Sequence, residues 1–300
     1  MTKKRIALLI ASAMVCCTVW AAKPRASHII YVGFDGWGSY SVEKAEMPTV
    51  KRLMAQGCYT LQKRAVLPSS SAVNWASMFM GAGPEVHGYT DWGSRVPEVK
   101  PRQLYKNNIF PTIFQLLRDQ RPEAVSGVLY EWEGIKYLVD TLSLSCHAQA
   151  RDFEKHPALL AEMAEKYIKE SKPQLLAICF DSPDHTGHVD GHDTPAYYAK
   201  LVELDGYLAR IVKAVEDAGI IDDTVFIITS DHGGINKGHG GKTWEEMETP
   251  LIVAGKGIRT GGVQLTESIV QYDVAATMAY ILRLKQPQAW VGRPIMSLFK

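Results

Sequence analysis

The sequence predicts an α/β fold with a mostly parallel central sheet and helices on both of its faces. Short runs of β-branched and aromatic residues alternate with segments of helical periodicity along the whole chain. No repeat, low-complexity segment or linker interrupts this alternation. Beyond an N-terminal leader, residues 23–300 provide enough chain for one large core, so we expect a single domain there.

The leader has the layout of a secretory signal peptide. Basic residues at 3–5 precede an apolar run at 6–20, which ends in Ala21 and Ala22. This run is shorter than the roughly 20 apolar residues of a spanning helix, which disfavours a membrane anchor. We therefore expect residues 1–22 to be removed and the protein to be exported, either periplasmic or secreted. Lipid attachment at the cysteine pair 16–17 is a weaker alternative.

The composition of the chain excludes several classes of protein. Lys+Arg 33 against Asp+Glu 32 gives a net charge of +1, which indicates neither a nucleic-acid groove nor an acidic tail. No later run is apolar and long enough to span a bilayer. Beyond the leader, Cys58, Cys146 and Cys179 allow one disulfide but not a disulfide scaffold. Pairing of Cys58 with Cys146 and the oligomeric state stay open.

The first half of the chain begins with a predicted strand at His28–Phe34, which reads HIIYVGF and lacks helical periodicity. A helix is expected over Pro48–Gln56, because proline suits its first turn and Gly57 follows it. Another helix should run over Ser71–Met80. The next expected elements are a helix at 111–119 and a strand at 125–130.

In the second half, helices are expected at 156–170, from Pro195 to Gly219 and at 273–284. Strands are expected at 174–180, Thr224–Thr229 and 250–254. Such alternation of strands and helices implies parallel pairing with helices on both faces. In folds of this kind, functional sites lie beyond the carboxyl ends of the strands.

Acidic and imidazole side chains follow three of these predicted strands. Asp35 comes directly after the first strand, DSPDHTGHVDGHD follows the strand at 174–180, and DHGGINKGHGG follows the one at Thr224–Thr229. Burying so many carboxylates together is costly without a cation, and imidazole plus carboxylate is a ligand set for zinc. We therefore expect a metal site built from Asp35, Asp184, Asp231 and the histidines His185, His188, His192, His232 and His239.

A candidate nucleophile lies in LPSSSAVNWASMFMG, where serines precede a helix. Free backbone N–H groups and the helix dipole favour a phosphoryl group at such a position. A neighbouring metal ion would lower the pKa of a serine hydroxyl and so activate it. The segment alone leaves Ser69, Ser70 and Ser71 as candidates.

Four segments, FDGWG, SAVNWASMFMGAGPEVHG, SPDHTGHVDG and SDHGGINKGHGG, resemble the alkaline phosphatase superfamily, and most closely its nucleotide pyrophosphatase/phosphodiesterase branch. The C-terminal stretch YDVAATMAYILRL extends this resemblance over nearly the whole chain. It implies an alkaline-phosphatase-like three-layer sandwich that binds two zinc ions, although manganese or iron stays open. The implied ligands are Asp35, Ser71, Asp231 and His232 for one ion and Asp184, His188 and His239 for the other.

The resemblance also settles two choices of register. Asp181 and His185 have the same spacing as Asp184 and His188, but the Pro-Asp and Gly-His neighbours of the family pattern select the latter pair. His185 and His192 would then be supporting or surface residues. Ser71 becomes the nucleophile because it lies three residues before Asn74. The Asn74 side-chain amide and the Ala72 backbone N–H would then donate to a phosphoryl oxygen.

Two departures from the family pattern bear on the substrate. The branch usually places an aromatic residue after its nucleophile, and here that residue is Ala72. This disfavours a nucleotide unless another aromatic side chain supplies the platform. No arginine lies near Ser71 in the sequence to bind a dianionic monoester, which favours diesters. The aromatic candidates are Trp37, Trp75, Tyr89 and Trp92.

The sequence thus predicts an exported two-zinc phosphoesterase that acts on a small-molecule phosphate ester. It would cleave phosphodiester or pyrophosphate bonds through a covalent phosphoseryl intermediate on Ser71. Two alternatives stay open: a phosphomonoesterase that uses the same site, and a metal-containing binding protein without turnover.

Overall fold

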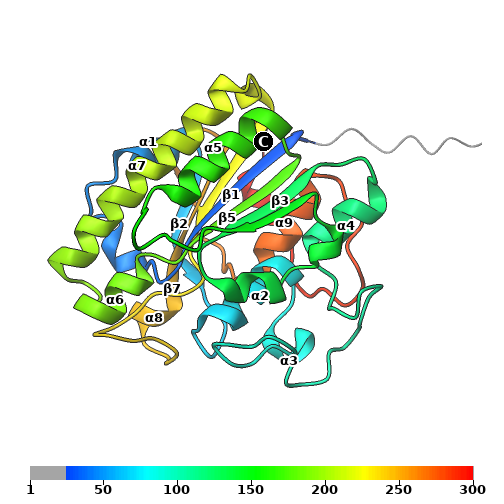
Figure 1. Ribbon diagram of the computed structural model, residues 1–300, viewed down its shortest axis with the longest axis horizontal. Coiled ribbons are helices and arrows are strands. Elements are labelled where there is room, and N and C mark those ends of the chain that lie inside the picture. The colour runs from blue at the N-terminus through cyan, green and yellow to red at the C-terminus, as the bar shows by residue number, and fades with distance from the viewer. Residues whose placement is uncertain (1–24, 300) are drawn as a thin grey trace, which may run out of the picture.

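A computed structural model describes residues 25–299, so the expected signal peptide at 1–22 lies outside the described residues. The chain forms one eight-stranded sheet in the order β4-β3-β5-β1-β6-β7-β2-β8 (Figure 1). Within residues 25–299, no helix combines the length and the apolar character that crossing a bilayer requires.

The centre of the sheet is parallel. β1 (His28–Phe34) lies between β5 (Leu175–Phe180) and β6 (Thr224–Thr229) and is parallel to both. β3 (Ser126–Tyr130) and β4 (Cys146–Gln149) continue the parallel arrangement beyond β5. The segments that follow β1, β5 and β6 therefore leave the sheet side by side at one edge.

The other side of the sheet is mixed. β7 (Glu248–Gly255) is antiparallel to β6 and to β2 (Cys58–Arg64), and β8 (Val263–Gln264) pairs parallel with β2. The prediction of a mostly parallel sheet is confirmed, although β2, β4 and β8 were not predicted. β2 and β4 carry partly exposed side chains, and β8 has two residues, so none of the three forms a continuous apolar run.

Helices cover both faces of the sheet, which confirms the three-layer architecture. Alternate side chains of β1 point to opposite faces of the sheet. Ile29 and Tyr31 belong to the hydrophobic cluster on one face, and Ile30 and Val32 belong to the cluster on the other face. α1 (Pro48–Gln56), α5 (Leu159–Ser171) and α7 (Pro195–Asp217) cover one face (Figure 1). α2 (Ser71–Met80), α4 (Ile113–Gln120) and α9 (Asp273–Ile281) cover the other.

Most predicted helices lie where expected, with small shifts at their ends. α1 and α2 have the predicted bounds. α4 begins at Ile113 because the Thr112 side chain accepts the backbone N–H of Gln115 as an N-cap. Short helices α3 (Pro84–His87), α6 (Asp184–Asp190) and α8 (Trp244–Met247), and 3₁₀ turns at Ser39–Ser41, Glu133–Tyr137, Thr141–Ser143, Ile221–Asp223 and Met296–Leu298, complete the described fold.

The three described cysteines are all free. Cys58 lies on β2 and Cys146 on β4, and five strands separate these two. Since neighbouring strands are about 4.8 Å apart, the two Cα atoms lie far beyond the roughly 7 Å that a disulfide can span. The open question of a Cys58–Cys146 bridge is therefore answered: the fold keeps them apart.

His87 ends α3 and is fully buried against α2, the helix that begins at Ser71. Its Nδ1 accepts the backbone N–H of Tyr89 at 3.1 Å, so the proton sits on Nε2, which donates to Ser77 Oγ at 3.0 Å. Burial lowers the pKa of His87 from 6.5 to about 3. The neutral ring is thus a fixed part of the support beneath α2.

This buried histidine predicts an acid-sensitive contribution to stability. Between pH 6.5 and about 3, His87 binds a proton in the unfolded chain but not in the folded one. Stability is therefore lost as the pH falls through this window, at up to about 1.4 kcal/mol per pH unit. His87→Gln should show a shallower fall in the free energy of unfolding, measured by urea denaturation from pH 7 to pH 4.

His147→Gln is the matched control, because His147 is exposed on β4. It should keep the wild-type slope. An unchanged slope in His87→Gln would contradict the assignment of this acid sensitivity to the buried ring.

Candidate active site

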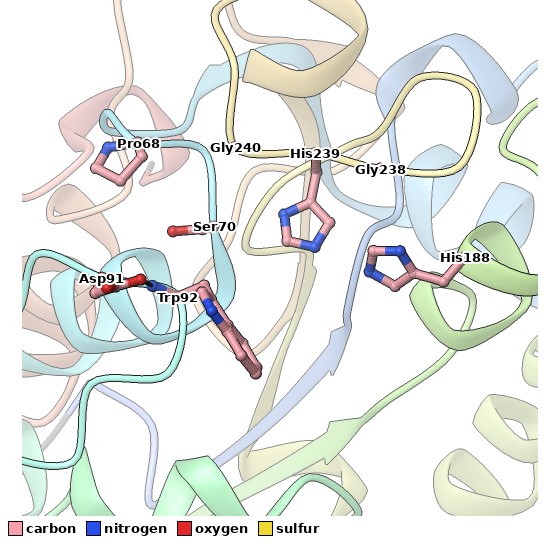
Figure 2. A pocket seen from close by; sticks show the side chains of 8 residues that line it. All are labelled: Pro68, Ser70, Asp91, Trp92, His188, Gly238, His239 and Gly240. Atoms are coloured by element: carbon pink, nitrogen blue, oxygen red, sulfur yellow. Dashed lines mark hydrogen bonds between the residues drawn. The ribbon is translucent and has the colours of Figure 1, made fainter.

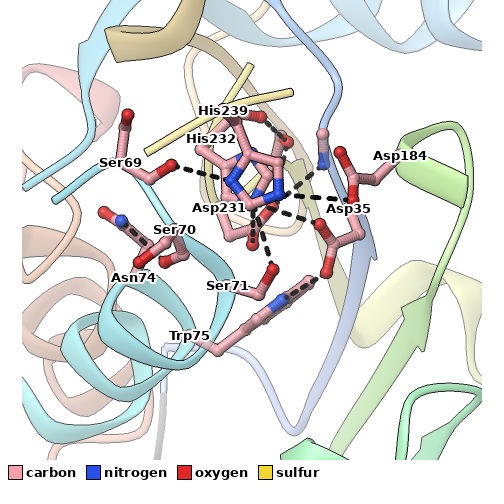
Figure 3. A network of polar contacts seen from close by, with 12 residues as sticks. Asp35, Ser69, Ser70, Ser71, Asn74, Trp75, Asp184, Asp231, His232 and His239 are labelled. Carbon is pink, nitrogen blue, oxygen red and sulfur yellow. Dashed lines mark hydrogen bonds and ion pairs between the residues drawn. The ribbon is translucent and has the colours of Figure 1, made fainter. Parts of the chain in front are cut away.

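Three aspartates meet at the carboxyl edge of the central strands (Figure 3). Asp35 follows β1, Asp231 follows β6 after one serine, and Asp184 opens α6 after β5. All three are buried, and the backbone N–H of Asp184 donates to the carbonyl of Asp35 at 3.0 Å. The convergence of three strand ends, expected from the sequence, is observed.

Three of the predicted ligands lie around a fourth, His232. Its Nε2 lies 3.3 Å from Asp35 Oδ1 and 3.3 Å from Asp231 Oδ2. The same atom lies 3.1 Å from Ser71 Oγ, at the first turn of α2. The hydroxyl, the imidazole and the two carboxylates thus surround one point.

A second group gathers around Asp184. Its Oδ2 lies 3.0 Å from His188 Nε2, one helical turn along α6, and 3.6 Å from His239 Nε2. The His239 ring stacks on the His232 ring with centroids 3.8 Å apart, so the two groups adjoin each other. The structure therefore places all seven predicted ligands in one double cluster.

The alternative pair in the DSPDHTGHVDGHD segment lies elsewhere. His185 Nδ1 is 3.8 Å from Asp181 Oδ2, and the His185 ring packs edge-on against Phe153. Asp184 and His188, rather than Asp181 and His185, thus face His239. This agrees with the register that the Pro-Asp and Gly-His neighbours selected.

The three histidines predicted to be ligands all carry a proton on Nδ1. In His188, His232 and His239, Nδ1 lies 2.9, 2.8 and 3.1 Å from a backbone carbonyl oxygen. A carbonyl can only accept, so each Nδ1 carries a proton, and each ring that gives up its Nε2 proton has a lone pair that faces a carboxylate. The carbonyls are those of Lys237, Gly233 and Ser69. This is the arrangement that orients imidazole ligands on a metal ion.

Two carboxylate oxygens in this cluster lack a hydrogen bond. Within residues 25–299, Asp35 Oδ1 and Asp231 Oδ2 are buried without a hydrogen-bond partner. Burial, followed by the charge of Asp231, raises the pKa of Asp35 well above its usual value. Burial and the charge of Asp184 raise the pKa of Asp231 to about 7. Unpartnered oxygens and imidazole lone pairs that face one another fit a divalent cation such as zinc.

Asp184 is surrounded by imidazoles instead. Burial acts to raise its pKa, but hydrogen bonds with His188, His192 and His239 outweigh burial and hold the pKa well below the usual range. In return, the hydrogen bond with Asp184 raises the pKa of His188 to about 9. Without a cation, protons on the imidazoles offset this buried carboxylate, and metal binding would release them.

His192 is a buried supporting residue in this cluster. Its Nε2 lies 3.3 Å from Asp184 Oδ1, whereas His188 contacts Oδ2, and its Nδ1 lies 3.3 Å from the carbonyl of Asn236. The ring fills a slot between Gly187 and Gly234, where a Cβ on either glycine would collide with it. His192 thus ties α6 to the loop after β6 and fixes the orientation of Asp184.

Two further contacts brace the carboxylates and were not anticipated. Trp75, on α2, donates its indole N–H to Asp35 Oδ2 at 2.9 Å. Beneath Asp231, the buried Lys63 donates to the carbonyl of Ser230 at 3.0 Å, and Gln271 donates to the carbonyl of Asp231. The burial of Lys63 could not be predicted, because nothing in the sequence around it distinguishes it from a solvent-exposed lysine on a strand.

The predicted role of Asn74 is wrong for this structure. Its amide nitrogen donates to three backbone carbonyls at 3.2, 3.1 and 3.0 Å, and its Oδ1 accepts the backbone N–H of Val66 at 2.7 Å. Helical side chains point toward the N-terminus, so this fully buried amide shapes the loop before Ser71. The other expected donor, the N–H of Ala72, donates to the carbonyl of Trp92 at 3.2 Å. The three carbonyls belong to Val66, Pro68 and Ser70.

The four aromatic candidates for a substrate platform differ in their exposure to solvent. Trp37, Trp75 and Tyr89 are buried in the core. Trp92 is 63% exposed and lines a cavity together with His188 and His239 (Figure 2). The exposure of Trp92 beside the cluster could not be predicted from the composition or from the spacing of residues.

Residues 29–250 match the model of the type I phosphodiesterase / nucleotide pyrophosphatase family. The chain is 22% identical over 231 residues to human (Homo sapiens) ectonucleotide pyrophosphatase/phosphodiesterase family member 5, covering 75% of this chain and 48% of that protein. It is 30% identical over 133 residues to the catalytic subunit of human GPI ethanolamine phosphate transferase 2, covering 43% and 14%. The chain thus spans less than half the length of these relatives.

Solved structures share the fold. An inactive variant of murine ectonucleotide pyrophosphatase/phosphodiesterase 5 in complex with AMP superposes with a TM-score of 0.72 at 15% identity, over 91% of this chain and 100% of that one. A phosphonate monoester hydrolase from Silicibacter pomeroyi gives a TM-score of 0.69 at 12% identity, over 90% and 76%. Both similarities confirm the predicted alkaline-phosphatase-like α/β fold.

The slot that holds His192 predicts a non-additive pair of substitutions. Gly234→Ala should lower the free energy of unfolding by roughly 1–3 kcal/mol, because its Cβ collides with the His192 ring. In a His192→Ala background the methyl group has room, and the same substitution should cost less than about 1 kcal/mol. Chemical denaturation of the four proteins measures this coupling.

Gly238→Ala serves as the control, because a Cβ at that position of the same loop meets open space. It should change stability by no more than about 0.5 kcal/mol. An equal loss of unfolding free energy on Gly234→Ala in both backgrounds would show that the added methyl group does not collide with the His192 ring.

Proposed function

Because the chain belongs to the type I phosphodiesterase / nucleotide pyrophosphatase family, we propose that it hydrolyses phosphodiester or pyrophosphate bonds with Ser71 as its nucleophile. One observation carries the proposal: Ser71 Oγ lies 3.1 Å from His232 Nε2, at the start of α2 and at the mouth of the double cluster. The dipole of α2 favours a negatively charged phosphoryl group at this position.

The double cluster would hold two zinc ions, although its nitrogen and oxygen donors also suit manganese or iron. Asp35, Asp231 and His232, with Ser71, would hold one ion. Asp184, His188 and His239 would hold the other. Bound zinc would lower the pKa of the serine hydroxyl and stabilise negative charge on the phosphoryl and leaving oxygens.

In the proposed reaction, Ser71 Oγ gives up its proton to solvent and attacks phosphorus. The bond between phosphorus and the leaving oxygen breaks as the new O–P bond forms, and the leaving group takes up a proton from solvent. A water molecule then cleaves the phosphoseryl ester, which restores the hydroxyl and releases a phosphomonoester or phosphate. His232, held through its Nδ1 by the carbonyl of Gly233, keeps Nε2 directed at Ser71 throughout. Trp75 holds Asp35 in place from the opposite side.

A preference for diesters is part of the proposal. Among the residues that line the cavity beside Ser71, neither Lys nor Arg occurs to bind the extra charge of a monoester. The alternatives are a monoesterase that uses the same site and a metal-containing protein without turnover. We also propose export to the periplasm or the medium, from the basic and apolar layout of residues 1–22.

The first test compares bis-p-nitrophenyl phosphate with p-nitrophenyl phosphate, using purified protein of known metal content. A higher kcat/KM for the diester, with two zinc ions per chain, would support the proposal. Activity on the monoester alone would replace it with the phosphomonoesterase. Bound metal without turnover of either ester would favour the binding protein.

Replacing the nucleophile should remove turnover without removing the fold. Ser71→Ala should lower kcat by at least roughly 10³-fold, because it removes the hydroxyl that lies 3.1 Å from His232 Nε2 and is proposed to attack phosphorus. Mass spectrometry of wild-type protein, acid-quenched during turnover of bis-p-nitrophenyl phosphate, should find a p-nitrophenyl phosphoryl group on the peptide that contains Ser71.

Ser69→Ala and Ser70→Ala are the matched controls within the same triplet. Ser69 Oγ donates to the carbonyl of Gly241 at 2.7 Å, and Ser70 Oγ is buried without a partner. Both variants should keep the p-nitrophenyl phosphoryl label. Turnover in Ser71→Ala, or a label that moves with another serine, would refute the assignment.

A further inference from the structure

A cavity of about 450 Å³ is lined by Ser70, the residue directly before Ser71 (Figure 2). Its lining includes His188 and His239, so one wall belongs to the double cluster. The rest comes from the loop before α2, from the two glycines that flank His239 and from the segment around Trp92. A group attached to a phosphorus atom at Ser71 would therefore extend into this space.

Trp92 is held in this cavity by its backbone. Its carbonyl accepts the N–H of Ala72 at 3.2 Å, and its own N–H donates to Asp91 Oδ1 at 2.6 Å. The first bond fastens Trp92 to the residue that follows the nucleophile. Figure 2 shows the indole lying across the open space from the rings of His188 and His239.

The Trp92 ring is far more exposed than the other tryptophan side chains near the site. Trp37 and Trp75 are at most 1% exposed, whereas Trp92 is 63% exposed. Covering an indole face removes a large apolar area from water, and stacking against a second ring adds to that gain. The ring thus offers an uncovered, flat apolar surface at a fixed position.

The charges that line the cavity limit what can lie there. Lys and Arg are absent from the lining residues, and Asp91 contributes a carboxylate. An additional negative charge on the substituent would face Asp91 without a Lys or Arg side chain to offset it. A neutral flat ring avoids this repulsion, and the volume lies within the range of small-molecule sites.

We propose that Trp92 is the platform for a planar aromatic substituent, without negative charge, on the phosphate ester that the site cleaves. The proposal names the substrate class of the function proposed above and rests on that function. It makes Trp92 a specificity-determining residue, which contacts the substrate but takes no part in bond breaking.

The test measures binding of phenylphosphonate and methylphosphonate to the metal-loaded protein by calorimetry. Each probe carries one substituent, so its orientation on Ser71 is not ambiguous. Stacking on one ring face should make phenylphosphonate bind about tenfold more tightly. Trp92→Ala should bring the two affinities within about twofold of each other, and Trp92→Phe should keep most of the difference. 4-Carboxyphenylphosphonate should bind more weakly than phenylphosphonate.

Trp244→Ala is the matched control, because Trp244 is 62% exposed and lies under the guanidinium of Arg64, outside the cavity lining. It should leave the preference for phenylphosphonate unchanged. Kinetics add a second measurement: in Trp92→Ala, KM for bis-p-nitrophenyl phosphate should rise about tenfold while kcat stays within about twofold.

The outcomes separate the two proposals. A wild-type protein that cleaves diesters, but whose phosphonate preference survives in Trp92→Ala, would overturn the platform and leave the phosphodiesterase intact. A wild-type protein that cleaves neither test ester would overturn the proposed function itself. A preference for methylphosphonate, or for the carboxylated ring, would contradict the substrate class directly.

Discussion

The structure depends on the cost of placing three carboxylates side by side in its interior. β5, β1 and β6 are adjacent and parallel, and each delivers one aspartate to the same edge. Hydrogen bonds offset part of the repulsion: Trp75 donates to Asp35, and the N–H of Gly36 donates to Asp231 Oδ1 at 3.1 Å. Within residues 25–299, two carboxylate oxygens still lack hydrogen-bond partners, so protons or a bound cation have to offset the remaining charge.

The supports of the cluster also connect its parts to one another. The Nδ1 of His239 is held by the carbonyl of Ser69, and Ser69 Oγ donates to the carbonyl of Gly241. The loop that precedes the nucleophile and the loop that carries His239 therefore hold each other. His192 makes the corresponding connection between α6 and the loop after β6. Ser71 and the predicted ligand residues thus form one connected unit.

The sequence predicted the central strands and the acidic and imidazole clusters well, because buried parallel strands are continuous apolar runs and the polar residues follow them directly. It did not predict α6, because glycines at 187 and 191 are unfavourable in a helix. This helix places Asp184 and His188 one turn apart on the same face. The role of Asn74 was misread because it depends on the direction of one side chain. Direction and exposure are set by packing among distant segments, which also explains why Trp92 was not separated from the buried aromatic residues.

The attachment of Trp92 has a consequence for how such a protein can change. Residues 88–112 contain no helix or strand, and they meet the nucleophile helix through the bond from Ala72 to the carbonyl of Trp92. Ser71 and the predicted metal ligands instead lie after the central strands or on α2 and α6. Insertions or substitutions in this surface segment can alter which molecules are accepted while the reacting centre keeps its geometry. Selectivity and reactivity are therefore separately adjustable in this architecture.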